Sequence, residues 1–240
     1  ISRRHAEITV TDDGQANIKD LNSRNGTFLN NKKLVSQKDL NKGDIIKIGK
    51  MAFKYIPQGD PERLTYDKLN LDAHTDGLTK CYNKSFFNNS SEIEFKKAKL
   101  TKSTVSLIMF DLDHFKKLND TMGHDAGDYV LKTISELVRK SAIRKNDIFA
   151  RYGGEEFVII LPNTQVKEAS EIAERIRSTV EKFPFLYNKE HKIKVTVSIG
   201  VSEYSKNFSC STEFFKSVDN ALYKSKDGGR NKVTIFKKDT

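Results

Sequence analysis

The sequence predicts a two-domain protein in which an all-β sandwich is followed by a mixed α/β domain. Residues 1–57 contain short strand-like runs separated by Gly, Asn and Asp, whereas residues 76–240 combine helix-spaced and strand-spaced apolar positions. Between them lies a polar segment with leucines at positions 64, 69 and 71. We therefore expect domains at 1–57 and 76–240, joined by a linker at 58–75 that could form a helix.

In the first domain, short apolar runs alternate with turn residues. The predicted strands cover residues 7–10, 17–19, 27–29, 45–48 and 52–56. Turn signals such as Asn25-Gly26 separate them, and prolines at positions 57 and 61 close the region. This spacing is typical of an all-β sandwich.

In the second domain, the apolar periodicity changes along the chain. We predict, in order, a strand at 105–110, a helix around 130–138, a hairpin at Gly153-Gly154 running into 157–161, a helix around 166–180 and a strand at 193–201. A helix near 213–226 and a strand near 232–237 follow. The order β-α-β-β-α-β is the ferredoxin-like arrangement of polymerase palms and nucleotide cyclases. It would place Asp111 beside the Gly-Gly hairpin on neighbouring strands.

Composition excludes several classes of protein. The 240 residues are 37% hydrophobic, and no apolar stretch approaches the length of a membrane-spanning helix or opens the chain as a signal peptide. We therefore expect a cytoplasmic protein without a membrane span. Cys81 and Cys210 do not form a zinc pattern or a disulfide framework, and we expect both to pack as small apolar residues. The net charge of +10 suits anionic ligands, but no nucleic-acid-binding motif is present.

Two carboxylate segments each adjoin a predicted strand. Asp111 follows the run at 105–110, and Glu155 with Glu156 precedes the run at 157–161. Clustered carboxylates repel one another unless a hard divalent cation such as Mg²⁺ holds them together, commonly shared with substrate phosphates. The pattern indicates phosphoryl-transfer chemistry.

Each of these features also has a purely structural interpretation. Gly153-Gly154 could be an ordinary hairpin turn, and Asp111 or Asp113 could cap a helix. Lys226 and Arg230 could be cations at the C-terminus of a helix. Their joint order and spacing favour the functional interpretation.

Residues 76–240 resemble a GGDEF diguanylate cyclase domain, with the signature turn spelled Gly153-Gly154-Glu155-Glu156. The similarity extends to Asp76-Gly77-Leu78-Thr79, to the segment 111–128 and to the segment 226–231. The resemblance implies that two GTP molecules are joined into the bacterial second messenger cyclic di-GMP, with release of two pyrophosphates.

The resemblance also implies a role for particular residues. Asp111, the Leu112 carbonyl and Glu155 would hold two Mg²⁺ ions per GTP, for which Mn²⁺ could substitute, and Glu156 would support the metal or the transition state. Asn119 and Asp128 would recognise guanine, since a carboxylate accepts hydrogen bonds that guanine donates and adenine does not. The phosphate contacts would be Lys226, Arg230, Lys116 and backbone N–H groups around Phe115.

Two regulatory features follow from the same resemblance. Because one domain binds one GTP, the active form should be a homodimer, at least transiently. Arg144 and Asp147 match the Arg-x-x-Asp product-inhibition site of many members, and Arg175 lies where a further arginine often joins it. A surface ion pair is the alternative for these residues.

Residues 1–57 resemble an FHA domain, a module that binds phosphothreonine peptides. The resemblance rests on the segments 2–8 and 20–30. It implies that Ser2 and Arg3 contact phosphate, that Asn25 contacts the peptide backbone with Arg24 adjacent, and that His5 is structural. The family's earlier strands and its phosphate-binding Gly-Arg do not occur in the sequence, so we expect a segment to precede residue 1.

The combination predicts a diguanylate cyclase controlled by product feedback and by phosphothreonine recognition, either of a partner or of the chain's own preceding segment. Two alternatives stay open. One is a receptor that binds cyclic di-GMP without catalysis, and the other is a phosphopeptide scaffold with an idle catalytic domain.

Overall fold

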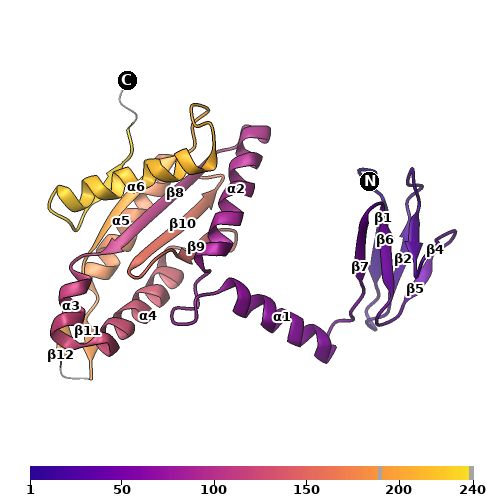
Figure 1. Cartoon of the computed structure of the whole chain (residues 1–240), viewed down its shortest axis with the longest axis horizontal. Helices are drawn as coiled ribbons and strands as arrows, with labels where there is room; N and C mark the ends of the chain where they lie inside the picture. The colour runs from indigo at the N-terminus through magenta and orange to yellow at the C-terminus, as the bar shows by residue number, and fades with distance from the viewer. Residues whose placement is uncertain (189–190, 238–240) are drawn as a thin grey trace. The chain divides into compact units, whose positions relative to one another are not determined.

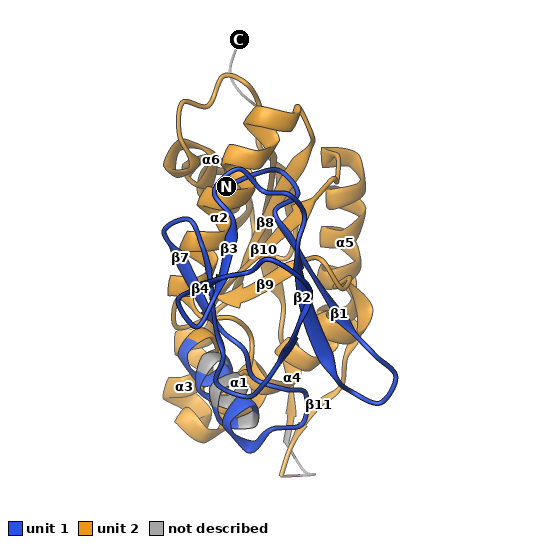
Figure 2. Cartoon of the chain, turned by 90° about the vertical axis from the view of Figure 1, so that its right-hand side faces the viewer, with its two compact units in different colours: residues 1–73 blue, residues 74–240 orange. Residues whose placement is uncertain are grey.

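The structure, a computed structural model, describes residues 1–188 and 191–237, without the side chains at 64, 66–68, 70 and 191. The chain divides into two compact units, an N-terminal unit of Ile1–Ala73 and a C-terminal unit of His74–Thr240 (Figure 2). The division assigns most of the predicted linker to the N-terminal unit, and the domain limits at 57 and 76 stay predictions. Among the described residues, no helix has both the length and the apolar character needed to cross a bilayer.

The N-terminal unit is rich in β-structure. Its seven strands are β1 (Ala6–Val10), β2 (Ala16–Asp20), β3 (Thr27–Leu29), β4 (Lys32–Lys33), β5 (Lys38–Leu40), β6 (Ile45–Ile48) and β7 (Met51–Lys54). They form two antiparallel sheets, ordered β1-β2-β5 and β4-β3-β6-β7, and residues of both sheets meet in one small core that includes Ile18 and Ile46. The five predicted strands are present, while the arrangement of the sheets as a sandwich stays a prediction.

Helix α1 (Pro61–His74) occupies most of the predicted linker. Pro61 suits the first helical position because its missing N–H would have no helical partner there, and Glu62 complements the positive end of the helix dipole. The side chains of Leu69 and Leu71 are 60% and 61% exposed. The Leu64 side chain, also noted in the sequence, lies outside the described residues.

The C-terminal unit has a five-stranded sheet in the order β14-β13-β8-β10-β9, of which Figure 1 labels β8, β10 and β9. All pairs are antiparallel except β13 with β14. Its elements are α2 (Lys84–Thr101), β8 (Val105–Leu112), α3 (Phe115–Met122), α4 (His124–Ser141), β9 (Ile148–Arg151), β10 (Glu156–Pro162), α5 (Val166–Lys182), β11 (Phe185–Tyr187), β12 (His191–Ile193), β13 (Val197–Glu203), α6 (Ser211–Asp227) and β14 (Val233–Ile235). The β-α-β-β-α-β order expected from the sequence is confirmed.

Strand β8 is buried along its whole length because helices cover both faces of the sheet. Successive side chains of β8 face opposite sides of the sheet. Ile108 and Phe110 belong to the core that contains residues of α4 and α5, and Leu107 and Met109 to the core that contains residues of α2 and α6. Asp111 lies two residues beyond Met109 and therefore faces the same side of the sheet as Leu107 and Met109. Its side chain therefore lies on the α6 side of the sheet.

Helix α6 packs directly on strand β13. A Cβ atom added to Gly200 would lie 2.4 Å from both the Leu222 nitrogen and the Val218 carbonyl oxygen of α6. Only glycine allows the backbones to come so close.

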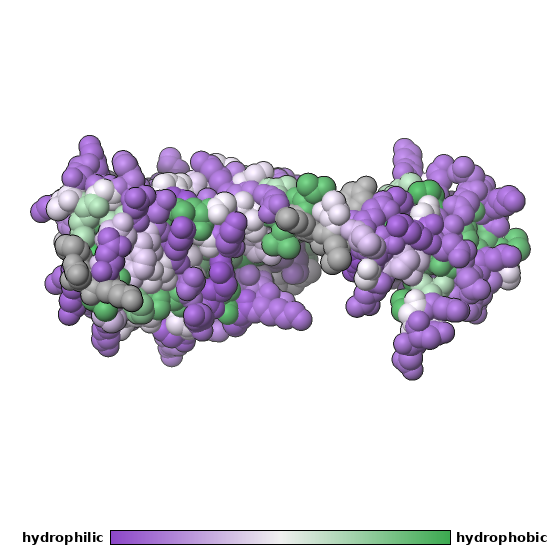
Figure 3. All heavy atoms as spheres, turned by 90° about the horizontal axis from the view of Figure 1, so that it is seen from below, coloured by the Kyte–Doolittle hydropathy of each residue, from purple (hydrophilic) through white to green (hydrophobic). Residues whose placement is uncertain are grey.

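The face seen in Figure 3 is mostly hydrophilic with apolar residues among the polar ones, and the exposed large apolar side chains include Val35 and Leu100. Both cysteines are free thiols. Cys81 is buried, as expected, but Cys210 is exposed at the start of α6, so the expectation of burial was wrong for that residue.

Candidate active site

The carboxylates lie at the paired ends of β8 and β10. Glu156 is directly opposite Asp111 across the antiparallel ladder, and the turn that holds Gly153 and Gly154 connects β10 to β9. The Leu112 N–H points to the Glu155 carbonyl oxygen at 3.4 Å. A Cβ on Gly153 would lie 2.6 Å from Oε2 of Glu156, so the glycine leaves room for that carboxylate. The structure thus brings Asp111, Leu112, Glu155 and Glu156 together.

Asp111 is a buried carboxylate with a lysine partner. Its exposed fraction is 7%, and its Oδ2 lies 2.7 Å from Nζ of Lys226 in the last turn of α6. Burial raises the pKa of Asp111 to about 6, with a further upward contribution from Glu155 and Glu156, while Lys226 opposes the rise. At neutral pH the group is therefore ionised, and the ammonium balances its charge.

Arg151 holds the Gly-Gly turn in place from the end of β9. Its Nε and Nη2 donate to the Gly154 carbonyl at 3.0 and 2.7 Å, and Nε also donates to the Gly153 carbonyl at 3.2 Å. Its Nη1 pairs with Asp76 at 3.1 Å, and Asp76 in turn accepts hydrogen bonds from the backbone and hydroxyl of Thr79. One guanidinium therefore joins the segment 76–79 to the Gly-Gly turn.

Helices α3 and α4 carry the residues expected to bind nucleotide. Asn119 projects from α3 against Gly127 of α4, where an added Cβ would lie 2.0 Å from its Oδ1. Within the described chain, Asn119 Oδ1 is a buried side-chain oxygen without a hydrogen-bond partner. An unpartnered buried amide oxygen is costly, so this position suits a ligand that donates hydrogen bonds. Lys116 and Asp128 are exposed, and Phe115 is buried.

Arg230 lies beyond α6, in the exposed turn that follows Lys226 by four residues. Asp113 does not cap α3: the N-cap residue is His114, which makes no side-chain cap bond. Asp113 instead accepts hydrogen bonds from Ser198 and Thr196. The helix-cap interpretation of Asp113 was therefore wrong.

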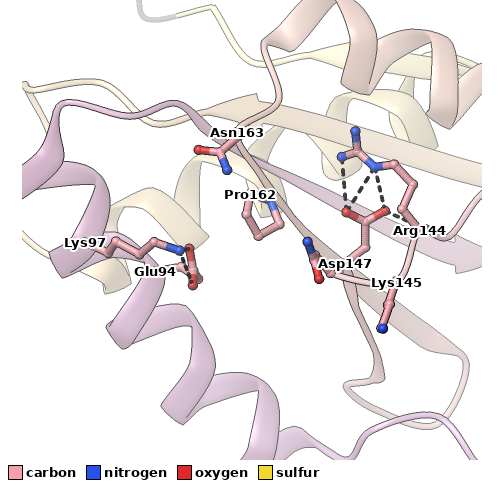
Figure 4. A pocket seen from close by; sticks show the side chains of 8 residues that line it. Glu94, Lys97, Arg144, Lys145, Asp147, Pro162 and Asn163 are labelled. Atoms are coloured by element: carbon pink, nitrogen blue, oxygen red, sulfur yellow. Dashed lines mark hydrogen bonds and ion pairs between the residues drawn. The ribbon is translucent and has the colours of Figure 1, made fainter.

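A second polar site surrounds Arg144. A cavity of about 600 Å³ is lined by Glu94, Lys97, Arg144, Lys145, Asn146, Asp147, Pro162 and Asn163 (Figure 4). Arg144 donates to both carboxylate oxygens of Asp147 and pairs with Glu168 of α5 at 3.0 Å. The hydrogen bond to Asp147 raises the pKa of Arg144 further.

Arg175 is exposed on α5 and is not among the residues that line this cavity. The structure therefore brings together two of the three residues expected at the product site. Lys97 and Glu94, which line the cavity from α2, were not predicted, because nothing in their local sequence relates them to Arg144.

In the N-terminal unit, Ser2 lies beside the loop that contains Arg24 and Asn25. The Arg24 N–H donates to Ser2 Oγ at 3.2 Å, and Asn25 lines a cavity of about 320 Å³ together with Gly26, Phe28, Asn31, Lys47 and Gly49. Arg3 is exposed. His5 is buried and lies within hydrogen-bonding distance of the Gly26 carbonyl at 3.2 Å, an arrangement that fits a structural role.

The donor set around Asp111 consists of oxygen atoms, which suit Mg²⁺ or Mn²⁺. In the part of the chain that the structure describes, no three His, Cys, Asp or Glu side chains are grouped as a metal site. Mg²⁺ is commonly held by one or two carboxylates and completed by water and substrate phosphates, so this limited set fits that ion.

Comparison with known families decides the relationship. The model of the family described as "Diguanylate cyclase, GGDEF domain" matches residues 73–232, and the FHA domain model matches residues 1–49. The chain belongs to the GGDEF diguanylate cyclase family.

Individual members of the GGDEF family agree with this assignment. Diguanylate cyclase A of Treponema denticola is 47% identical over 136 residues, which cover 57% of this chain and 36% of that protein. The chain therefore spans about a third of the length of this curated relative.

Solved structures of GGDEF domains share the fold. The coiled coil and GGDEF domain of DgcB from Caulobacter crescentus, in complex with c-di-GMP, has a TM-score of 0.68 and 32% identity, and the match covers 72% of this chain and 91% of that one. The active GGEEF domain of a diguanylate cyclase from Vibrio cholerae has a TM-score of 0.62 and 33% identity, with coverage of 66% and 99%.

Proposed function

We propose that the C-terminal unit is an active diguanylate cyclase that condenses two GTP molecules into cyclic di-GMP and two pyrophosphates. The observation that carries the proposal is the meeting of Asp111, Glu155 and Glu156 at paired strand ends, facing Lys226, within a chain of the GGDEF family. The active domain from Vibrio cholerae is described by the same Gly-Gly-Glu-Glu-Phe spelling.

In the proposed complex, guanine is recognised by Asn119 and Asp128. The unpartnered Oδ1 of Asn119 supports this role, because guanine offers N–H donors on the edge where adenine offers no donor pair. ATP would leave the buried Asn119 Oδ1 unsatisfied at a cost of about 1–3 kcal/mol. Lys226, Arg230, Lys116 and the backbone near Phe115 would contact the phosphates, as cations and N–H groups suit polyanions.

Asp111, the Leu112 carbonyl and Glu155 would hold Mg²⁺, and Mn²⁺ offers the same ligand preference. A bound divalent ion supplies Lewis-acid polarisation of the α-phosphate and eases loss of the 3′-hydroxyl proton. Glu156, opposite Asp111, adds negative charge that would strengthen cation binding.

Each condensation forms a bond from a 3′-oxygen to an α-phosphorus, breaks the α–β phosphoanhydride and releases one proton and one pyrophosphate. Since each domain would present one GTP, the two 3′-hydroxyls must be supplied across a homodimer. Closing the ring takes two such steps.

Cyclic di-GMP would also inhibit the enzyme at the cavity of Arg144 and Asp147, with Arg175 recruited from α5. Guanidinium groups can bind phosphates and guanine edges in a bidentate manner. The cavity of about 600 Å³ and the basic residues in its lining support this role. Product inhibition that is unchanged in Arg144→Ala would remove this part of the proposal.

The N-terminal unit would bind a phosphothreonine through Ser2, Arg3, Arg24 and Asn25, in a partner or in a preceding segment of the chain. The contact between Ser2 and Arg24 and the cavity at Asn25 support this assignment. We place the protein in the cytoplasm, where GTP and phosphoproteins are available. Equal activity and association with and without a phosphothreonine ligand would contradict regulation through this unit.

The decisive experiment incubates the chain with GTP and Mg²⁺ and identifies the product by chromatography and mass. We expect cyclic di-GMP from the native protein and none from Glu155→Ala. If no product forms at any protein concentration while cyclic di-GMP binds tightly, the protein is a receptor and not a cyclase. If neither occurs while phosphothreonine peptides bind, it is a scaffold.

A further inference from the structure

The turn that follows α6 has an unusual backbone. Gly229, Arg230 and Asn231 have consecutive φ angles of 103°, 64° and 45°, all in the left-handed region. For a residue with a side chain such a conformation is unfavourable, less so for Asn than for Arg, and a run of three persists when the surroundings enforce it. Arg230 is one of the two non-glycine residues held this way in the turn, so something must fix its position.

The first constraint on the turn comes from Asp113, just beyond β8. Its Oδ2 accepts hydrogen bonds from the Asn231 backbone N–H at 3.0 Å and from Thr196 Oγ1 at 2.8 Å. Its Oδ1 accepts a hydrogen bond from Ser198 Oγ at 2.6 Å, and its own N–H donates to the Thr196 carbonyl at 2.9 Å. Asp113 therefore ties the turn to the strand ends that carry the catalytic carboxylates.

The second constraint comes from α5 and acts on the Asn231 side chain. Arg177 Nη1 donates to Asn231 Oδ1 at 2.8 Å, and Asn231 Nδ2 donates to Glu181 Oε1 at 2.7 Å. Arg177 is itself held by Glu174 and Glu181. Both polar ends of the Asn231 side chain are thus used.

We propose that Asp113 and Arg177 are positioning residues that act through Asn231 to hold Arg230 at the GTP phosphates. The proposal rests on the proposed function, because it takes Arg230 as a phosphate contact. Asn231 is the coupling residue: its backbone meets Asp113 and its side chain meets Arg177. Neither Asp113 nor Arg177 needs to touch GTP.

The test measures GTP KM, kcat and GTP affinity for the full chain and four single variants. Arg230→Ala removes the proposed contact, Asp113→Ala and Asn231→Gly each release one anchor of the turn, and Glu171→Gln is the control because Glu171 is exposed on α5 and is not among the residues that hold Asn231. Asn231→Gly tolerates the positive φ and removes the side-chain anchor to Arg177 and Glu181, while the backbone N–H of residue 231 remains for Asp113. We expect KM to rise by about ten- to a hundredfold in the first three variants, with smaller changes in kcat, and to stay near native in Glu171→Gln.

Double variants distinguish positioning from general stability. If Asp113 acts through Arg230, then Asp113→Ala should add little to Arg230→Ala, because coupled residues are not additive. A purely structural loss would lower activity by the same factor in both backgrounds and would overturn the proposal. Should Asp113→Ala fail to fold, the milder Asp113→Asn takes its place, and Asn231→Gly with its Arg230→Ala double variant tests the Arg177 anchor in the same way.

The outcomes also separate the two proposals. Native protein that neither binds nor converts GTP would remove the proposed function and this inference with it. Native GTP binding that is weakened by Arg230→Ala but unchanged by both Asp113→Ala and Asn231→Gly would overturn only the inference.

Discussion

The contact between Asn119 and Gly127 shows how one missing side chain shapes a binding site. The Asn119 amide occupies the space where a Cβ of residue 127 would be, and its Oδ1 is left without a partner in the described chain. The glycine therefore sets the orientation of the amide that we propose reads guanine.

For Gly127→Ala we expect GTP affinity to fall by about tenfold, since the displaced amide loses a hydrogen bond to the base. Stability should change little, because the gain of about 1 kcal/mol in helix propensity offsets the close contact of the new Cβ with Cζ of the buried Phe115 at 3.1 Å. Calorimetric titration with GTP and urea unfolding check the two effects. Gly77→Ala, whose Cβ would meet nothing within 4 Å, is the matched control. Unchanged GTP affinity in Gly127→Ala would contradict the assignment.

Asp20 organises the loop of the N-terminal unit that contains Arg24 and Asn25. Burial tends to raise its pKa, but hydrogen bonds from Thr27 and Ser23 prevail and lower it to about 2. Because the pKa of Asp20 is lower in the folded state than its unfolded value of 3.8, the ionised carboxylate stabilises the fold at pH values above 3.8. That contribution is lost as the pH falls toward 2.

We expect Asp20→Asn to cost about 1 kcal/mol at pH 7, a figure reduced for solvent screening of a partly exposed group. The difference from the native protein should shrink as the pH falls from 4 toward 2. Urea unfolding of both proteins across this pH range, with an NMR titration of the Asp20 carboxyl, measures it. A destabilisation that does not change with pH would show that the charge of Asp20 is not its cause.

At the residue scale, the sequence identifies groups that lie within recognisable motifs and misses their distant partners. Asp111 could be placed beside the Gly-Gly hairpin in advance because each acidic segment adjoins an apolar strand. The partners of Asp113 could not, since they lie at positions 196, 198 and 231 and meet it only in the folded sheet.

At the element scale, prediction succeeded where burial produces a strong apolar pattern. Strand β8 and helices α4 and α5 bury many apolar side chains and were predicted. Helix α2 was missed because its buried positions include only two large apolar residues, Phe87 and Phe95, with Ser91 and Ala98. Strands β4 and β5 are too short and polar for a pattern to show.

Strand β9 ends at Arg151, which holds the Gly-Gly turn and Asp76. We expect Arg151→Lys to lower kcat by about ten- to a hundredfold, because lysine cannot hold two turn carbonyls and Asp76 at once. Steady-state kinetics with GTP, together with thermal unfolding, check this. Lys84→Arg is the control, since it preserves the cation that lies 4.2 Å from the centre of the neighbouring Tyr152 ring. Native kcat in Arg151→Lys would show that the turn keeps its geometry without this clamp.

At the scale of the whole molecule, the proposed chemistry makes activity depend on protein concentration. A single domain presents one GTP, so specific activity should rise with concentration until dimers predominate. Initial rates over a hundredfold dilution series, paired with sedimentation velocity, measure this. Constant specific activity in a range where sedimentation shows only monomers would contradict the homodimer.

The close packing at Gly200 has a consequence for control of the enzyme. Because β13 and α6 touch backbone to backbone, α6 cannot tilt toward the sheet without a collision. The packing holds the body of α6 against β13, and Lys226 in its last turn lies 2.7 Å from Asp111 at the end of β8. A regulatory signal would therefore change little in the arrangement of α6 and β13. We expect such a signal to change how often two catalytic domains encounter each other. It would then change the rate at which productive dimers form, and not the activity of each dimer.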